Sequence, residues 1–209
     1  EVMSFEKLRA QAQKKLSHLE ALHYFSYLHQ KEALLHYQGE PLASGPIYQS
    51  LLDSLPFTLT QGQREVLKEL DESFCSGSLK PHLIQGDVGS GKTILGFLAL
   101  CRALDNQQQG ALMAPTELLA RQHYDNFKKL LPSHCQKILY LSGSVSTKEK
   151  KNLYSLLSSN QPFVVIGTHA LFQDEVKFHC LRVIIVDEQQ RFGVKQRAQL
   201  LSKASRNLA

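Results

Sequence analysis

Two kinds of segment are missing from the sequence. No apolar run approaches the roughly 20 residues that a helix needs to cross a membrane, and the first residues lack the charged and then apolar pattern of a secretory leader. Internal repeats are also lacking, and we expect the glutamines at 107–109 to form a polar turn. With 43% hydrophobic and 21% charged residues, the composition is that of a globular protein. We therefore expect no membrane partner.

Cysteine is scarce and scattered, at positions 75, 101, 135 and 180. Zinc sites usually show paired Cys or His at short spacing, and disulfide-stabilised domains are smaller and richer in cysteine. Neither pattern occurs in the sequence, so we expect reduced thiols in a cytosolic protein.

The length and charge set limits on what the chain contains. Its 209 residues suffice for one domain with an appendage and are too few for two full α/β domains. Because the chain begins at Glu1 rather than Met, we expect a processed product or a fragment of a longer protein. A net charge of +5 and a pI near 9.0 permit a nucleic-acid partner without requiring one.

An interruption near residue 40 divides the chain. Over 4–38, apolar residues recur at helical intervals of three and four: Phe5, Leu8, Ala12, Leu16, Leu19 and Leu22. Glycine and proline then break the pattern, at Gly39, Pro41, Gly45 and Pro46. We expect a helical segment over 1–45 and an α/β domain over 46–209.

After this boundary, short apolar runs alternate with helical stretches. Strands are predicted at 82–85, 111–114, 136–141, 163–166 and 182–186. Helices are predicted near 93–105, 117–130, 147–158 and 190–203. This alternation is typical of a parallel β-sheet with helices on both faces. Ligands of such sheets bind at the carboxyl ends of the strands.

A glycine-rich octapeptide follows the first predicted strand and opens a helix. It matches the P-loop pattern, in which backbone N–H groups and a helix N-terminus surround a phosphate. Its residues are Gly86, Asp87, Val88, Gly89, Ser90, Gly91, Lys92 and Thr93. Lys92 is then expected to reach the β- and γ-phosphates of ATP, and the Thr93 hydroxyl to bind Mg²⁺.

Two carboxylates end the last apolar run. Asp187 and Glu188 follow Val183-Ile184-Ile185-Val186, the arrangement known as Walker B. We expect Asp187 to bind Mg²⁺ on the same side as Thr93. Glu188 is expected to act catalytically by orienting or deprotonating the attacking water, and Lys92 to act catalytically at the phosphates. Alone, an Asp-Glu pair is more often a surface turn. Together with a P-loop it indicates nucleotide hydrolysis.

Several motifs resemble superfamily-two helicases, specifically the RecG branch. They comprise the P-loop, Met-Ala-Pro-Thr-Glu-Leu-Leu-Ala-Arg-Gln-His at 113–123, Ile-Gly-Thr-His-Ala-Leu-Phe-Gln at 166–173, Val-Asp-Glu-Gln-Gln-Arg-Phe-Gly-Val at 186–194, and Leu-Pro-Phe-Thr-Leu-Thr-Gln-Gly-Gln at 55–63. The resemblance covers essentially the whole chain. Transcription-repair coupling factors usually have Asp-Glu-Glu-His at the acidic motif, so Gln189 favours RecG. The resemblance implies a RecA-like domain.

The resemblance also assigns roles to single residues. Gln63 would read the adenine edge and Phe57 would pack nearby, although Gln63 could equally be an exposed residue on a helix over 61–74. Six residues lie in loops that resemble DNA-contacting loops, and they could equally cap helices: Thr116, Glu117, Gly143, Ser144, Thr168 and His169. Gln190 would lie at the nucleotide where the family has histidine, so it cannot carry charge there. That departure puts DNA-stimulated turnover in doubt.

By this resemblance, the full-length protein would hydrolyse ATP to remodel branched DNA, such as replication forks and Holliday junctions, in recombination and repair. Its partners would include a second RecA-like domain and a wedge domain of the same longer chain. A cytoplasmic, nucleoid-associated bacterial monomer is expected. Two alternatives stay open: a degenerate nucleotide-binding module with a regulatory role, and a nucleotide kinase or small P-loop transferase. The kinase would need acceptor-binding arginines and a lid, and no such segment stands out.

Overall fold

The computed structural model describes residues 39–77, 82–87 and 89–188. The predicted helices at 4–38 and 190–203 lie outside these ranges. The elements follow in the order α2 (Pro46–Asp53), α3 (Gln61–Cys75), α4 (Lys92–Asp105), β1 (Gln109–Met113), α5 (Glu117–Leu130), η1 (Pro132–Lys137), β2 (Ile138–Leu141), α6 (Thr147–Leu157), β3 (Val164–Gly167), η2 (His169–Phe172) and β4 (Leu181–Val186). Among the described residues, no helix is long and apolar enough to span a bilayer. The four cysteines are free.

The strands form one parallel sheet in the order β2-β3-β1-β4. Four of the five predicted strands are thereby confirmed, with bounds shifted by at most two residues. The helices predicted at 93–105, 117–130 and 147–158 are confirmed as α4, α5 and α6. Because all the strands are parallel, their carboxyl ends meet at one edge of the sheet.

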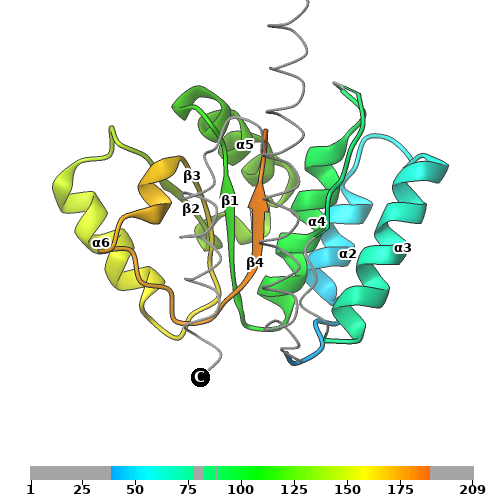
Figure 1. Ribbon diagram of the computed structural model, residues 1–209, viewed down its shortest axis with the longest axis horizontal. Coiled ribbons are helices and arrows are strands. Elements are labelled where there is room, and N and C mark those ends of the chain that lie inside the picture. Colours follow the sequence, from blue (N-terminus) through cyan, green and yellow to red (C-terminus); the bar gives the residue numbers. More distant parts are fainter. Residues whose placement is uncertain (1–38, 78–81, 88, 189–209) are drawn as a thin grey trace, which may run out of the picture.

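Helices cover both faces of the sheet, as predicted (Figure 1). Successive residues of a strand point to opposite faces. In β1, Leu112 therefore joins the core cluster under α4 and α5, whereas Met113 joins the cluster under α6 and the segment after η2. Helix α2 packs on the outer side of α4 and adds a third layer there (Figure 1).

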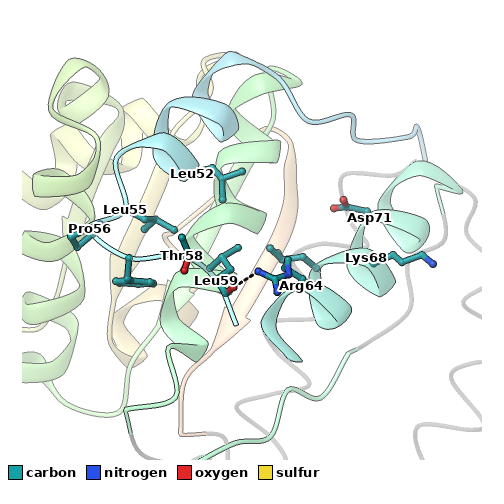
Figure 2. Close-up of a pocket in the computed structure, with 10 residues that line it drawn as sticks. Leu52, Leu55, Pro56, Thr58, Leu59, Arg64, Lys68 and Asp71 are labelled. Atoms are coloured by element: carbon teal, nitrogen blue, oxygen red, sulfur yellow. Dashed lines mark hydrogen bonds between the residues drawn. The ribbon is translucent and has the colours of Figure 1, made fainter. Parts of the chain in front are cut away.

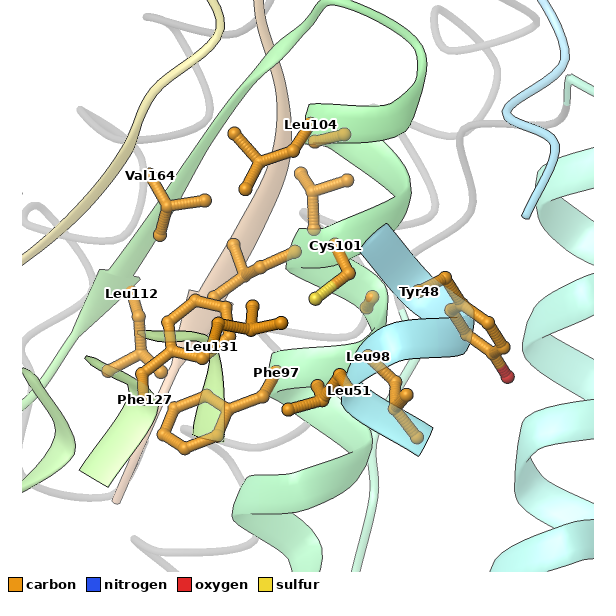
Figure 3. Packing of buried hydrophobic residues seen from close by; sticks show 14 of the residues in the cluster. Tyr48, Leu51, Phe97, Leu98, Cys101, Leu104, Leu112, Phe127, Leu131 and Val164 are labelled. Atoms are coloured by element: carbon orange, nitrogen blue, oxygen red, sulfur yellow. The ribbon is translucent and has the colours of Figure 1, made fainter. Parts of the chain in front are cut away.

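The larger core cluster is centred on α4, whose residues 95–104 are all buried. Figure 3 shows Leu112 and Val164 of the sheet on one side of this helix and Tyr48 and Leu51 of α2 on the other. Phe97 stacks on a phenylalanine of α5, Phe127, with ring centroids 4.4 Å apart. Helix α4 is therefore held from both sides, which fixes the position of its first turn.

The prediction of a strand at 82–85 is wrong for this structure, which has no strand over the described residues 82–87. His82 Nε2 lies 2.9 Å from Ser73 Oγ of α3, and side chains of α3 line a small pocket with 82–85. The segment therefore lies against a helix instead of pairing with β4. Of residues 82–87, only Ile84 is half-buried and the others are exposed, so the segment lacks the burial of a central strand.

Two charged residues of α4 connect it to the preceding chain. The carboxylate of Asp105 accepts three backbone N–H bonds at the start of α2, from Gly45, Ile47 and Tyr48 at 2.9, 2.8 and 2.9 Å. Arg102 is 3% exposed, donates to Leu42 O at 2.9 Å and pairs with Asp71 of α3. The bonds to Asp105 satisfy N–H groups that a helix start leaves without partners.

Gln109 is fully buried, so the prediction of a polar turn over 107–109 is wrong for this residue. Its Nε2 donates to the carbonyls of Leu157, Ser159 and Gln161 at 3.0, 3.2 and 3.0 Å. Its Oε1 accepts from the backbone N–H groups of His179 and Cys180 at 3.0 and 3.3 Å. One side chain thus joins the segments that lead into β3 and β4.

Candidate nucleotide-binding site

The expected phosphate cradle lies at the start of α4. Gly89 and Gly91 have φ values of +82° and +79°, a conformation that residues with a Cβ rarely adopt. Gly91 is the N-cap of α4 and carries no side chain to cap it. The first N–H groups of the helix have no intrahelical acceptor, so the cradle suits an anion. Val88 lies outside the described residues.

The Lys92 side chain folds back across this loop. Its Nζ donates to Gly86 O at 2.6 Å and to Asp87 O at 2.7 Å, with a longer contact of 3.4 Å to Ser90 Oγ. These bonds fix the ammonium over the loop. A positive charge is thereby added to the N-terminus of α4, which already favours anions.

Gln63 contacts the P-loop directly. Its Nε2 donates to Ser90 O at 2.8 Å, and its Oε1 accepts from Thr60 N–H at 2.9 Å in the capping box of α3. A carboxamide has a second hydrogen and a second lone pair, so these bonds leave capacity for a base. Adenine recognition by Gln63 stays a prediction, although its helix, expected at 61–74, is confirmed.

Phe57 is 48% exposed and lines a mainly apolar hollow between α2 and α3 (Figure 2). Arg64, which donates to Leu59 O, borders the same hollow. Gln63 is not among the lining residues. The structure therefore does not bring Phe57 and Gln63 together in one pocket, and base stacking by Phe57 stays a prediction.

Asp187 follows β4 at the carboxyl edge, as expected. Its N–H donates to Met113 O at 2.9 Å, and its Oδ2 lies 2.7 Å from His123 Nε2. The hydrogen bond with His123 lowers the pKa of Asp187 most, the positive charge of Lys92 lowers it further, and burial opposes both. Lys92 and Asp187 are therefore near enough to interact electrostatically, and the carboxylate stays ionised.

The donor set fits Mg²⁺, which proteins bind through one or two carboxylates together with phosphate oxygens. The Asp187 side chain keeps 32% of its surface exposed, so it is accessible to an ion. Thr93 lies in the first turn of α4, one residue after Lys92. Joint coordination by Thr93 and Asp187 stays a prediction.

Glu188 has a φ of +53°, the left-handed region that side chains other than glycine's seldom occupy. The chain therefore turns sharply after Asp187, and Glu188 leaves the direction of β4 with its side chain exposed. Exposure is compatible with the predicted role of orienting water, and that role stays a prediction. Gln190 lies outside the described residues.

The six residues predicted to contact DNA follow β1, β2 and β3 at the carboxyl edge. Thr116 caps α5, since its Oγ1 accepts from Leu119 N–H at 3.3 Å. Thr168 is 1% exposed, and its Oγ1 has no hydrogen-bond partner among the described residues. The Thr168 hydroxyl is therefore not accessible to DNA in this conformation, whereas the side chain of His169 is exposed. DNA contact by the six residues stays a prediction.

Glu117 joins two of these loops. Its Oε1 accepts from Ser144 N–H at 3.1 Å, and a Cβ added at Gly143 would come within 3.1 Å of the same oxygen. Lys150 Nζ donates to Gly143 O at 2.8 Å and holds the loop from α6. The loop after β2 is therefore held in place by Glu117, the first residue of α5.

The bond to Ser144 lowers the pKa of Glu117 below its ordinary value of about 4.5. The bond is complete above that value and is lost only as the pH falls through the lowered pKa. We expect the Ser144 amide resonance, followed by NMR between pH 7 and 3, to shift with a midpoint below 4.5. In Glu117→Gln this shift should disappear. A midpoint at or above the ordinary value in the parent chain would contradict the bond.

His123 was not predicted as a site residue. It occurs in the motif at 113–123, yet its place on the buried face of α5 gives it the pattern of a core position. Only the spatial contact with Asp187 distinguishes it, and no spacing rule connects positions on a helix and a distant strand.

A left-handed glycine loop that opens a helix, with a lysine across it and a strand-end carboxylate nearby, defines a P-loop nucleotide-binding domain on a parallel α/β sheet. The comparisons with known proteins agree with this class. The family model described as DEAD/DEAH box helicase matches residues 60–209. The chain belongs to the DEAD/DEAH box helicase family.

Curated relatives similar to the chain are ATP-dependent DNA helicases RecG. The protein of Pasteurella multocida is 46% identical over 155 residues, which cover 74% of this chain and 22% of that protein. The Bacillus subtilis protein is 45% identical over 152 residues, which cover 73% of this chain and 22% of that protein. That of Synechocystis is 42% identical over 161 residues, covering 77% and 19%. The chain thus spans about a fifth of the length of these relatives.

A solved structure, of RecG bound to a three-way DNA junction, matches with a TM-score of 0.63 and 39% identity. The match covers 74% of this chain and 21% of that one. The predicted resemblance to RecG-type helicases and the RecA-like α/β fold are therefore confirmed. The regulatory and kinase alternatives find no support in these relatives, all of which are named as helicases.

Proposed function

We propose that the chain binds ATP with Mg²⁺ as the first motor domain of a RecG-type DNA helicase. The observation that carries this proposal is the Lys92 ammonium held over a left-handed glycine loop, with the ionised Asp187 carboxylate nearby. Residues 46–209 would form this domain and 1–45 a helical linker. A regulatory module would need the same nucleotide site, so binding alone does not separate the two.

Each residue at the site has a distinct part in the proposed reaction. The N–H groups of the loop and Lys92 bind and orient the phosphates, and Gln63 holds the loop through Ser90. Thr93 and Asp187 would bind Mg²⁺, which neutralises charge on the phosphates when bound. Glu188 would accept a hydrogen bond from the attacking water and orient it.

For the full-length protein we propose ATP-driven remodelling of branched DNA in the cytoplasm of a bacterium. The RecG relatives and the RecG–junction complex support this proposal. A wedge domain and a second RecA-like domain of the same longer chain would be its partners, with the protein a monomer. An arginine supplied by a partner domain contributes roughly 10³–10⁵ in rate to phosphoryl transfer. We therefore expect slow turnover by the 209 residues alone.

Equilibrium binding of a fluorescent ATP analogue, with Mg²⁺ and then with EDTA, tests the proposal. We expect micromolar binding that is tighter with Mg²⁺, and little phosphate release with or without forked DNA. Absence of binding would contradict the proposal. Steady DNA-stimulated release by this chain alone would show that it needs no second domain, and a complete lack of hydrolysis in a longer chain would favour a regulatory module.

A further inference from the structure

A buried histidine faces the carboxylate that is expected to bind metal. His123 is 8% exposed on α5, and its Nε2 lies 2.7 Å from Asp187 Oδ2. Its ring meets Phe97 edge-on, with centroids 6.3 Å apart and an interplanar angle of 87°. Phe97 is itself stacked on Phe127. The imidazole is therefore fixed by the core while one nitrogen points to the sheet edge.

The direction of this hydrogen bond follows from the chemistry of its partners. An ionised carboxylate only accepts hydrogen bonds, so the Nε2 of His123 must carry the proton and donate it. The bond occupies Oδ2 of Asp187. A carboxylate has about four lone-pair sites, so the bonds from His123 and from the Glu188 N–H leave capacity for a metal ion. Ligating carboxylates are commonly oriented by hydrogen bonds of this kind.

The histidine also prevents a competing contact. Lys92 is close enough for its charge to act on Asp187, and both groups lie at the same site. An unrestrained carboxylate beside an ammonium would be drawn into an ion pair with it. Such a pair would remove the lysine from the phosphates and the carboxylate from the metal. A donor that the core fixes in place competes with the ammonium for the carboxylate.

We infer that His123 is a positioning residue for nucleotide-bound Mg²⁺: it holds the Asp187 carboxylate in the orientation that binds the ion. This inference rests on the proposed nucleotide-binding function. It gives His123 no contact with ATP, so its effect is confined to the metal-dependent part of the binding energy.

Two variants of His123 and one of another histidine test this inference in the 209-residue chain. His123→Phe keeps an aromatic ring beside Phe97 but removes the donor, whereas His123→Gln retains a donor. His134→Phe, on η1, is the control. Two quantities are measured for each variant. The first is the Mg²⁺ concentration at which binding of the fluorescent ATP analogue reaches half of its maximum. The second is the affinity of the chain for the analogue in EDTA, without Mg²⁺. We expect His123→Phe to raise that concentration about 10- to 100-fold, with the affinity in EDTA nearly unchanged. In His123→Gln, the Mg²⁺ concentration for half-saturation should stay close to that of the parent chain.

Each other outcome is decisive. An unchanged Mg²⁺ dependence in His123→Phe, or an equal loss of affinity in EDTA, would show that the histidine serves only the core. If the parent chain shows no Mg²⁺-dependent binding, the proposed function fails and the inference fails with it. Should His123→Phe not fold, the ¹⁵N resonance of Nε2 in the parent chain gives a second measurement. We expect it to move when Mg²⁺ is added to the nucleotide-bound chain, and an unmoved signal would contradict the inference.

Discussion

Lys92→Ala is expected to weaken binding of the Mg²⁺–nucleotide complex about 10- to 100-fold, because a hydrogen bond to a charged group contributes about 1.5–3 kcal/mol. Among the described residues, the half-buried Lys92 donates to Gly86, Asp87 and Ser90 of the P-loop, so its loss removes little from the core. The melting temperature should change by a few degrees at most. Equilibrium titration with the fluorescent analogue, beside thermal unfolding, measures both quantities.

Lys128→Ala is the matched control for this substitution. Lys128 lies on α5 over the ring of Tyr124 and donates to its hydroxyl at 3.1 Å, so its removal takes the same charge from another surface. Affinity should stay within about twofold of the parent chain, since surface charges far from the ligand are largely screened by salt. Equal losses in both variants would mean that net charge, rather than the position of Lys92, determines binding.

Gln109→Leu should lower the free energy of unfolding by about 3–5 kcal/mol, since each buried polar group left without a partner costs about 1–3 kcal/mol. The leucine has a similar volume, but three carbonyls and two N–H groups lose the bonds that Gln109 makes. Of these five groups, the His179 N–H and the Leu157 carbonyl keep their bond to each other. Water can reach some of these groups, so the full sum is not expected. Urea denaturation measures the change.

Gln122→Leu provides the comparison for the stability measurement. Gln122 is exposed on α5, and a substitution there should alter stability by no more than about 0.5 kcal/mol. If Gln109→Leu were as mild as this control, the five bonds of Gln109 would contribute little to the folded state. The segments leading into β3 and β4 would then be held by apolar packing alone.

The parts of the fold that could be predicted from sequence are those in which local pattern and burial agree. The apolar run of β3 lies in a central strand that is buried throughout, where such a run belongs. The run of β4 forms the predicted strand, but this strand stands at the edge of the described sheet and its last three residues are half-buried. Residues 111–113 of β1 were expected in a strand. Gln109 itself was missed because nothing in its own sequence surroundings shows that a polar side chain will be enclosed by five backbone groups from other segments.

In the candidate site, too, the residues in local motifs could be predicted, whereas their partners from distant helices could not. Lys92 and Asp187 were predicted because each lies in a contiguous motif whose chemistry is readable within a few residues. The partners that hold the site come from elsewhere: Gln63 reaches the loop from α3, and His123 reaches the carboxylate from α5. Such contacts depend on how helices pack over the sheet, and a single sequence does not specify that packing.

Helix α4 has a mechanical consequence through its two ends. Its first turn carries Lys92, and its last turns carry Arg102 and Asp105, which bind the chain at 42–48. Fourteen residues of helix form a stiff rod about 21 Å long. The phosphate cradle and the chain at 42–48 are therefore connected by one rigid helix. Any tilt of α4 at the cradle also displaces the chain at 42–48.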